Sequence, residues 1–215
     1  MTCQNSVVAA RNSTPRRRTQ QERTAESTQR LITAAIELIA EKGIARTSAA
    51  EISERAGYSR SMVQFRYGSK ELLLETLLRE EYETRLLLGD SDQYPSGLER
   101  VLAQIDRLHD EAVANPELMR GFFVLCFEAI GPVPSLNTWI NDWLDRYHAS
   151  TAAALDSGRV DGSIRSDIDP KTESEAFVAS GLGYAFRWMV GPQLVDYPAL
   201  MRQWRKQLRA HLAMS

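Results

Sequence analysis

A short segment near the amino terminus, from Ser59 to Tyr67, carries side chains that can recognise nucleic-acid bases. Gln64 can form two hydrogen bonds with adenine, and Arg60 can do the same with guanine. Phe65 offers an apolar surface that fits the methyl group of thymine. Such side chains read a sequence only when they project from one face of a rigid element, so the surrounding elements decide the interpretation.

The pattern around this segment predicts a helix-turn-helix from about Ser48 to Tyr67. Ser48, followed three residues later by Glu51, indicates a capped helix start. The pair Ala56-Gly57 indicates the end of that helix, and Ser59 the start of the next. An ordinary pair of packed helices can show the same pattern, so the outward face of the second helix has to distinguish the two.

That outward face favours a partner surface. Successive helical residues turn by about 100°, so if Val63 faces the core, Ser61 and Phe65 point away from it and Gln64 lies on one flank. An outward phenylalanine is unfavourable unless something covers it. The alternative is that Phe65 packs beneath the first helix.

Apolar periodicity predicts helices almost throughout, and no stretch alternates with period two. We therefore expect an all-α fold of about nine helices. Residues 1–22 are expected to be a flexible basic arm, 23–70 a three-helix DNA-binding domain and 71–215 a larger helical domain. The expected helices are Thr24–Lys42, Ser48–Ala56, Ser59–Tyr67, Ser69–Leu88, Ser96–Ala114, Pro116–Ile130, Ser135–Ser157, Pro170–Met189 and Tyr197–Ala213.

Charge is distributed unevenly along the chain. Residues 1–70 contain 12 Lys and Arg against 6 Asp and Glu, and residues 71–215 contain 14 against 22. This asymmetry suggests an anionic partner for the first part only. Within the arm, Arg16, Arg17 and Arg18 could enter a minor groove or raise non-specific affinity, or could equally form a solvated tail.

Several other classes of protein are disfavoured. No apolar run approaches the ~20 residues of a membrane span, and the first 20 residues lack the apolar core of a secretion signal. Cys3 and Cys126 lie in different contexts, which fits a reducing cytoplasm better than a disulfide framework. His109, His148 and His211 lie on separate expected helices without metal-ligand spacing, and no phosphate-binding loop is present. We expect no enzyme, metal or cofactor.

The run from Ile44 to Leu73, together with the preceding Glu41-Lys42-Gly43, resembles the TetR family of regulators over about 50 residues. The resemblance implies a dimer that binds a palindromic DNA operator and changes affinity when a small molecule binds its larger domain, most often as a repressor. It also implies that Thr47 or Ser48, and Lys70, touch phosphates. The predicted DNA-binding residues are Thr47, Ser48, Tyr58, Ser59, Arg60, Ser61, Gln64, Phe65, Arg66 and Lys70.

Several positions depart from the family pattern, namely Tyr58, Ser61, Gln64, Arg66 and Tyr67. Gln64 stands where a tyrosine commonly contacts a phosphate, so that contact is in doubt. Arg66 could compensate with a fixed positive charge. These departures keep a second function open, a helical module that binds a small molecule or a partner without sequence-specific DNA binding.

Two features of the larger domain complete the expectation. Its aromatic middle could line an effector pocket or could simply be core, and the last two helices could pair in a dimer or only cover the subunit. The predicted ligand-binding residues are Phe122, Phe123, Cys126, Phe127, Trp139, Trp143, Tyr147, Tyr184 and Trp188. The predicted dimer residues are Gly181, Leu200, Trp204, Leu208 and Leu212. The partners expected are double-stranded DNA, a second copy and an unidentified effector, with no membrane.

Overall fold

The computed structural model describes residues 19–87, 93–131 and 134–214. Within these ranges the chain is helical, without a strand longer than an isolated bridge between Ile164 and Ala213. The predicted all-α class is therefore confirmed. Arg16, Arg17 and Arg18 lie outside the described residues. No helix in the described part is both long and apolar enough to cross a membrane.

Helix α1 (Gln20–Lys42) begins four residues before the predicted Thr24. Thr19 accepts a hydrogen bond from the backbone of Glu22, whose carboxylate in turn accepts one from the Thr19 amide at 2.7 Å. This reciprocal capping box satisfies two amides that a helix start leaves free. The end of the predicted basic arm is therefore already helical.

Helices α2 (Ala49–Arg55) and α3 (Met62–Tyr67) follow, and with α1 they form the head of the molecule. The predicted capping box of Ser48 and Glu51 is present. Helix α3 starts three residues later than predicted. Ser59 instead begins a turn, in which its carbonyl accepts from the Met62 amide at 2.9 Å.

A rod connects the head to the rest of the chain. It consists of α4 (Lys70–Leu77), a π-helical segment η1 (Leu78–Glu83) and α5 (Thr84–Leu86). Sequence periodicity predicted a single α-helix over this range, and the π-helical turn in its middle was not foreseen. Counted as one element, the rod brings the described helices to the nine expected.

The body contains α6 (Gly97–Ala114), α7 (Pro116–Glu128), α8 (Pro134–Asp161), α9 (Pro170–Val190) and α10 (Tyr197–Leu212). The predicted end of α8 at Ser157 was wrong, because the helix continues through Gly158 to Asp161. A Cβ on Gly97 would lie 2.1 Å from the Gly158 nitrogen, and one on Gly158 would meet Ile164 at 2.5 Å. These glycines therefore mark a close approach of helices.

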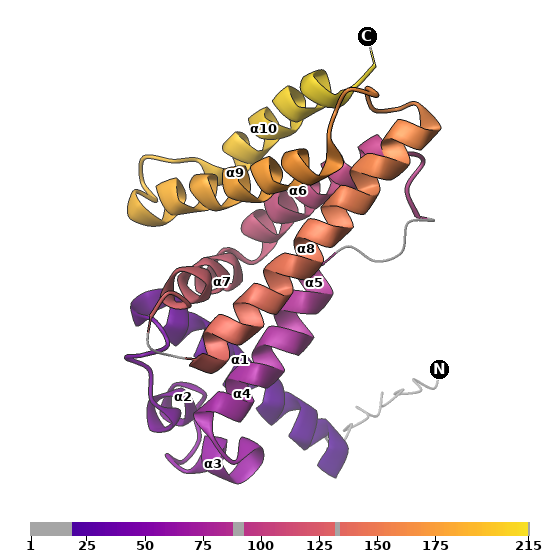
Figure 1. Ribbon diagram of the computed structural model, residues 1–215. Coiled ribbons are helices and arrows are strands. Elements are labelled where there is room, and N and C mark those ends of the chain that lie inside the picture. Colours follow the sequence, from indigo (N-terminus) through magenta and orange to yellow (C-terminus); the bar gives the residue numbers. More distant parts are fainter. Residues whose placement is uncertain (1–18, 88–92, 132–133, 215) are drawn as a thin grey trace, which may run out of the picture.

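The head lies at one end of an elongated molecule, and α9 and α10 lie at the other (Figure 1). The long α8 and the rod run between them, and α7 packs on α1. One apolar core extends from Leu31 and Ile52 in the head to Leu208 in α10. This continuity provides a packed path from the far end of the body to the head.

Candidate DNA-binding surface and effector cavity

The joint between α2 and α3 is fixed by one hydroxyl. Ser53 donates to the Ala49 carbonyl at 2.9 Å and accepts from the Val63 amide at 3.0 Å. Gly57 supplies the turn with φ of +82°, a conformation that other residues rarely adopt. The Tyr58 amide returns to the Ser53 carbonyl at 2.9 Å. These bonds hold α3 at a defined angle to α2, as a reading helix requires.

The outer face of α3 is open to solvent. Val63 is fully buried, whereas the Phe65 side chain is 83% exposed. The alternative that Phe65 packs beneath α1 is therefore wrong, and its predicted exposure is confirmed. Gln64 and Arg60 are exposed beside it, and Arg60 forms a loose ion pair with Glu54 at 3.3 Å. Ser48, Ser59 and Ser61 are exposed and Tyr58 is half-buried. Their contacts with DNA stay predictions.

Two members of the predicted DNA-binding set turn inward. Thr47 is only 2% exposed, and its hydroxyl donates to the Gly43 carbonyl at 2.7 Å. The Arg66 guanidinium donates to the Ser27 hydroxyl on α1 at 2.5 Å and is half-buried. In this conformation each of the two side chains is engaged within the head. Their contacts with DNA, and the compensation by Arg66 for the departure at Gln64, stay predictions.

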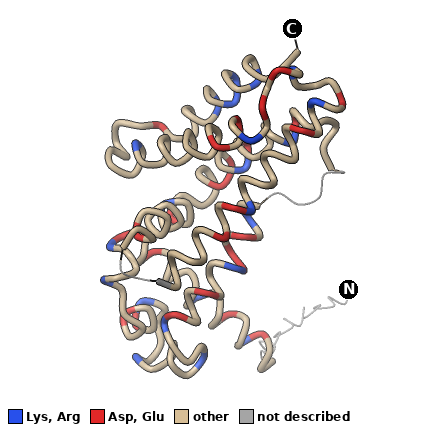
Figure 2. Tube along the Cα trace, viewed as in Figure 1, with Lys and Arg blue, Asp and Glu red and all other residues tan. Residues whose placement is uncertain are grey.

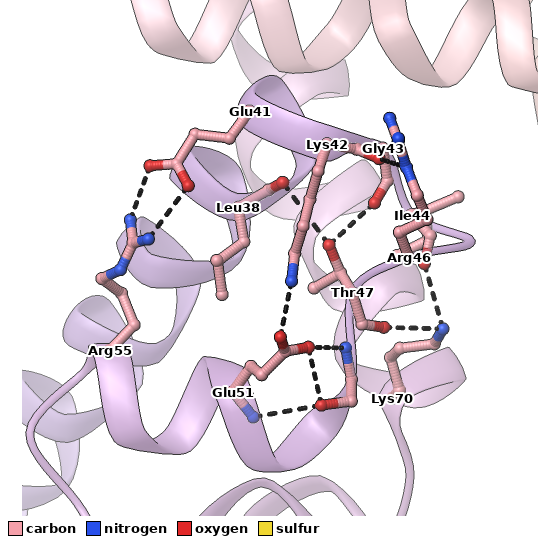
Figure 3. Close-up of polar contacts among 11 residues, drawn as sticks. Leu38, Glu41, Lys42, Gly43, Ile44, Arg46, Thr47, Glu51, Arg55 and Lys70 are labelled. Carbon is pink, nitrogen blue, oxygen red and sulfur yellow. Dashed lines mark hydrogen bonds and ion pairs between the residues drawn. The ribbon is translucent and has the colours of Figure 1, made fainter.

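Lys70 also has an internal task. Its ammonium donates to the carbonyls of Ile44 and Thr47 at 3.1 and 3.0 Å, which ties the start of the rod to the loop between α1 and α2 (Figure 3). An ammonium group has three hydrogens, so one remains for a phosphate. The predicted phosphate contact of Lys70 is therefore compatible with this geometry.

Ion pairs stabilise the same junction. Lys42 pairs with Glu51 at 2.6 Å, and Arg55 makes two hydrogen bonds to Glu41 at 2.8 and 2.9 Å (Figure 3). The hydrogen bond from Lys42, with those from Ser48, lowers the pKa of Glu51 to about 2. The Arg55 hydrogen bond lowers the pKa of Glu41. Both carboxylates stay charged at neutral pH. Figure 2 shows acidic and basic residues close to one another in the head.

A residue that sequence reasoning missed joins this junction from the body. The Glu128 carboxylate, at the end of α7, accepts a hydrogen bond from the Ile44 amide at 2.7 Å. The two residues are 84 positions apart, so no local pattern links them. The available signal was a carboxylate that directly follows the apolar run from Phe122 to Phe127.

The predicted effector residues divide into separate places. A cavity of about 30 Å³ lies in the centre of the body, and four of the nine predicted residues line it. Among the described residues, no charged side chain lines this cavity. Its lining is Leu108, Phe122, Phe123, Trp143, Leu144, Tyr147, Phe177, Val178, Gly181, Leu182 and Trp204.

The other five predicted effector residues lie elsewhere. Trp139 lines a groove between the rod and α8, and Tyr184 lines one between α9 and α10. Phe127 contacts Phe186, with ring centres 5.7 Å apart, and Trp188 stacks on Tyr197 at 4.8 Å. Burial raises the pKa of the Cys126 thiol to about 12, so the thiol stays protonated at neutral pH.

Most of the predicted dimer residues are occupied within the subunit. Trp204, Leu208 and Leu212 are buried, and a Cβ on Gly181 would lie 3.6 Å from the Trp204 ring. The apolar stripe of α10 therefore covers the subunit's own core, as the alternative reading had it. Exposed apolar side chains lie at the end of α9, at Phe186 and Val190, and in the connection to α10, at Leu194. Leu200 on α10 is half-buried.

Residues 31–77 match the sequence profile of the family described as "Bacterial regulatory proteins, tetR family". The match covers the end of α1, both helices of the helix-turn-helix and α4. No curated protein matches the chain. Among the described residues, no cluster of three His, Cys, Asp or Glu could hold a metal ion.

Solved structures share the fold over most of the chain. The MbdR regulator from Azoarcus sp. CIB matches with a TM-score of 0.72 and 21% identity, over 87% of this chain and 100% of that chain. NalD, the secondary repressor of the MexAB-OprM multidrug efflux pump in Pseudomonas aeruginosa, matches with a TM-score of 0.69 and 19% identity, over 90% of this chain and 99% of that chain. FadR from Bacillus subtilis, in complex with stearoyl-CoA, matches with a TM-score of 0.69 and 21% identity, over 85% of this chain and 98% of that chain.

Proposed function

We propose, from the premise that this chain belongs to the TetR family of bacterial regulatory proteins, that it is a ligand-responsive transcriptional repressor. It binds a palindromic DNA operator as a homodimer in the cytoplasm, and an effector bound in the body changes its affinity for that operator. We assign it no catalytic role. NalD, a repressor, and FadR, crystallised with stearoyl-CoA, have the same fold and support this proposal.

The observation that carries the proposal is the exposed outer face of α3. Phe65, Gln64 and Arg60 project from a short helix whose inner side is anchored by Val63 and by the Ser53 hydroxyl. A rigid helix with an aromatic, an amide and a guanidinium facing solvent suits the base edges of a major groove. Contact with DNA would cover the Phe65 ring, which is 83% exposed in the free protein.

The dimer follows from operator symmetry and from the free face of α9 and α10. A palindrome needs two reading helices about 34–36 Å apart. We assign the interface to Phe186, Val190, Leu194 and Leu200, because these apolar side chains are available to a second copy. Beside them lies a groove of about 610 Å³, lined in part by Gly183 and Tyr184.

The central aromatic cavity is the proposed effector site. Because its lining is apolar and a buried charge without a partner is costly, we expect an uncharged, apolar effector. A cavity of about 30 Å³ holds little more than one water molecule, so binding must separate helices that are packed together here. A ligand that favours the separated state lowers DNA affinity only by its difference in affinity between the two states.

The test is binding of the full chain to a palindromic fragment from its own promoter region, at several salt concentrations. The proposal expects a preference of ~10³-fold or more over random DNA and a steep loss of affinity with salt. Equal and weak binding to every sequence would instead favour a partner-binding module without sequence-specific DNA recognition.

A further inference from the structure

The contact between Glu128 and Ile44 joins two regions that the chain could have left separate. Glu128 ends α7 in the body, and Ile44 directly follows α1 in the head. The Ile44 side chain is buried, and its amide donates to Glu128 Oε2 at 2.7 Å. A hydrogen bond from an amide to a charged carboxylate is stronger than one between neutral groups.

The backbone at Gly43 is shaped to admit this carboxylate. A Cβ built on Gly43 would lie 2.0 Å from Glu128 Oε1 and 2.7 Å from its carboxyl carbon. Gly43 also has a φ of +82°, where other residues are strained. The carboxylate therefore lies directly against the backbone, in space that any other residue at position 43 would fill.

Both backbone polar groups of Ile44 are hydrogen-bonded to side chains from other elements. Its carbonyl accepts from Lys70 at the start of the rod, while its amide donates to Glu128 at the end of α7. The Lys70 ammonium also donates a hydrogen bond to the carbonyl of Thr47, the residue before the N-cap of α2. The loop that leads into the helix-turn-helix is thus fixed to two separate elements, as the junction in Figure 3 shows for the Lys70 side.

Helix α7 also lines the effector cavity. Phe122 and Phe123 border that cavity, and Glu128 lies five residues further along the same helix. Helix α7 packs along α1, so its displacement would move the carboxylate relative to the loop. Among the described residues Glu128 forms no ion pair with a basic side chain. Its carboxylate accepts a hydrogen bond from the backbone amide of Ile44.

We propose that Glu128 is a positioning residue for DNA reading, whose carboxylate holds the loop from Gly43 to Thr47 and thereby places α2 and α3 on the body. The proposal rests on the function proposed above. Losing the contact frees the head to move, and a mobile head fits the fixed half-site spacing of an operator less often.

The sign of the effect separates this role from simple electrostatics. Glu128→Ala and Glu128→Gln each remove one negative charge, which by itself strengthens attraction to DNA. Glutamine keeps an oxygen that can accept the Ile44 hydrogen bond, and alanine does not. Glu117→Ala is the matched control, because Glu117 is an exposed glutamate on the same helix that pairs with Arg120 at 4.0 Å.

The experiment measures, for the full chain and these three variants, affinity for the promoter fragment and for random DNA, exchange of the Ile44 amide by NMR, and thermal unfolding. We expect Glu128→Ala to lose about tenfold in affinity for the promoter fragment, none for random DNA, and the exchange protection of Ile44. Glu128→Gln and Glu117→Ala should stay within about twofold of the unaltered chain in both DNA affinities. Both variants should remain folded and keep the exchange protection of the Ile44 amide.

Three results would overturn the proposal. In the first, Glu128→Ala binds the promoter fragment as tightly as Glu117→Ala. In the second, Glu128→Gln is as weak as Glu128→Ala, or Ile44 stays protected in both. In the third, Glu128→Ala is unfolded under the binding conditions, and Glu128→Gln remains folded but loses affinity for the promoter fragment. If the unaltered chain shows no preference for the fragment, the proposed function itself has failed, and exchange at Ile44 then shows whether the contact exists without that role.

Discussion

Phe65 in the head and Phe122 in the body are both phenylalanines, but one is exposed to solvent and the other is buried. Phe65 is 83% exposed on α3, whereas Phe122 is 1% exposed and touches the rings of Tyr82, Phe123 and Trp143. Aromatic burial is a large source of stability, so Phe122 contributes to the fold. Phe65 forgoes that contribution, and its surface stays available to the proposed DNA partner.

The two regions are also held together differently. The head relies on directional polar contacts at its joints, such as those of Ser53, Lys70 and Glu51. The centre of the body relies on edge-on and stacked rings around an apolar cavity. Directional hydrogen bonds fix the angle between α2 and α3, which a DNA-reading helix needs. Packed aromatic rings can instead rearrange around a bound ligand.

The largest expected effect breaks the body side of this comparison. Phe122→Ala should lower the free energy of unfolding by about 3–5 kcal/mol, because a fully packed ring leaves a cavity. Urea unfolding measures it, with an unchanged slope showing that the unfolded state is the same. A loss below about 1 kcal/mol would mean that the aromatic cluster is loosely packed, contrary to the ring distances.

On the head side, Arg60→Ala should weaken operator binding by about 1–3 kcal/mol and relax the preference at one base pair. Lys70→Ala should weaken binding to all DNA alike. Since Lys70 also ties down Ile44 and Thr47, it should in addition lower the melting temperature, which Arg60→Ala should not. Binding to a set of single-base operator variants separates the two. Identical profiles for both variants would contradict the division of roles.

Phe65→Ala sharpens the comparison directly. We expect a change in unfolding free energy within about 0.5 kcal/mol, because the ring is exposed, together with an operator affinity about tenfold lower. Thermal unfolding and binding to the promoter fragment are measured on the same preparation. A destabilisation resembling that of Phe122→Ala would show that Phe65 has a packing partner within the protein.

The smallest expected effect concerns pH. Because the pKa of Glu51 is lowered to about 2 from the 4.5 of a free glutamate, its charge stabilises the fold above about pH 4.5. That contribution is lost as the pH falls through about 2. Glu51→Gln keeps a capping side chain but no charge. Its melting temperature should therefore be lower than that of the unaltered chain at pH 6, and the difference should shrink toward zero as the pH falls to about 2. A difference that stays constant with pH, or that persists in a Lys42→Met background, would remove the ion pair as its cause.

Much of the fold could be predicted from the sequence, because helix starts and apolar periodicity are local signals. The capping residues Ser48 and Ser69 and the first-turn Pro170 placed three helices closely. The start of α1 was missed because its first turn is polar, and only the pairing of Thr19 with Glu22 marks it. The helical course through Gly158 was missed because that glycine is explained by contacts with distant residues.

The candidate site was harder, because the direction of a side chain depends on neighbours distant in sequence. The exposure of Phe65 followed from angular spacing once Val63 was placed inward. The inward turn of Arg66 depends on Ser27, 39 residues away, and the Glu128 contact spans 84 residues. The stripe containing Trp204 showed that α10 has an apolar face, but the sequence could not tell whether the subunit or a second copy covers it.

The π-helical segment of the rod sets the register between head and body. The buried residues Leu74, Leu78, Tyr82 and Leu86 are each four positions apart. Steps of four overshoot the 3.6-residue turn of an α-helix and fall short of the wider π turn, so the two deviations offset one another and the side chains stay aligned. A π turn takes up about one residue more than an α turn, so deleting one residue from Leu78–Glu83 would convert the segment to α-helix and leave Leu86 on nearly the same face as Leu74. The segment therefore accommodates one extra residue of the rod without turning its buried face away from the core.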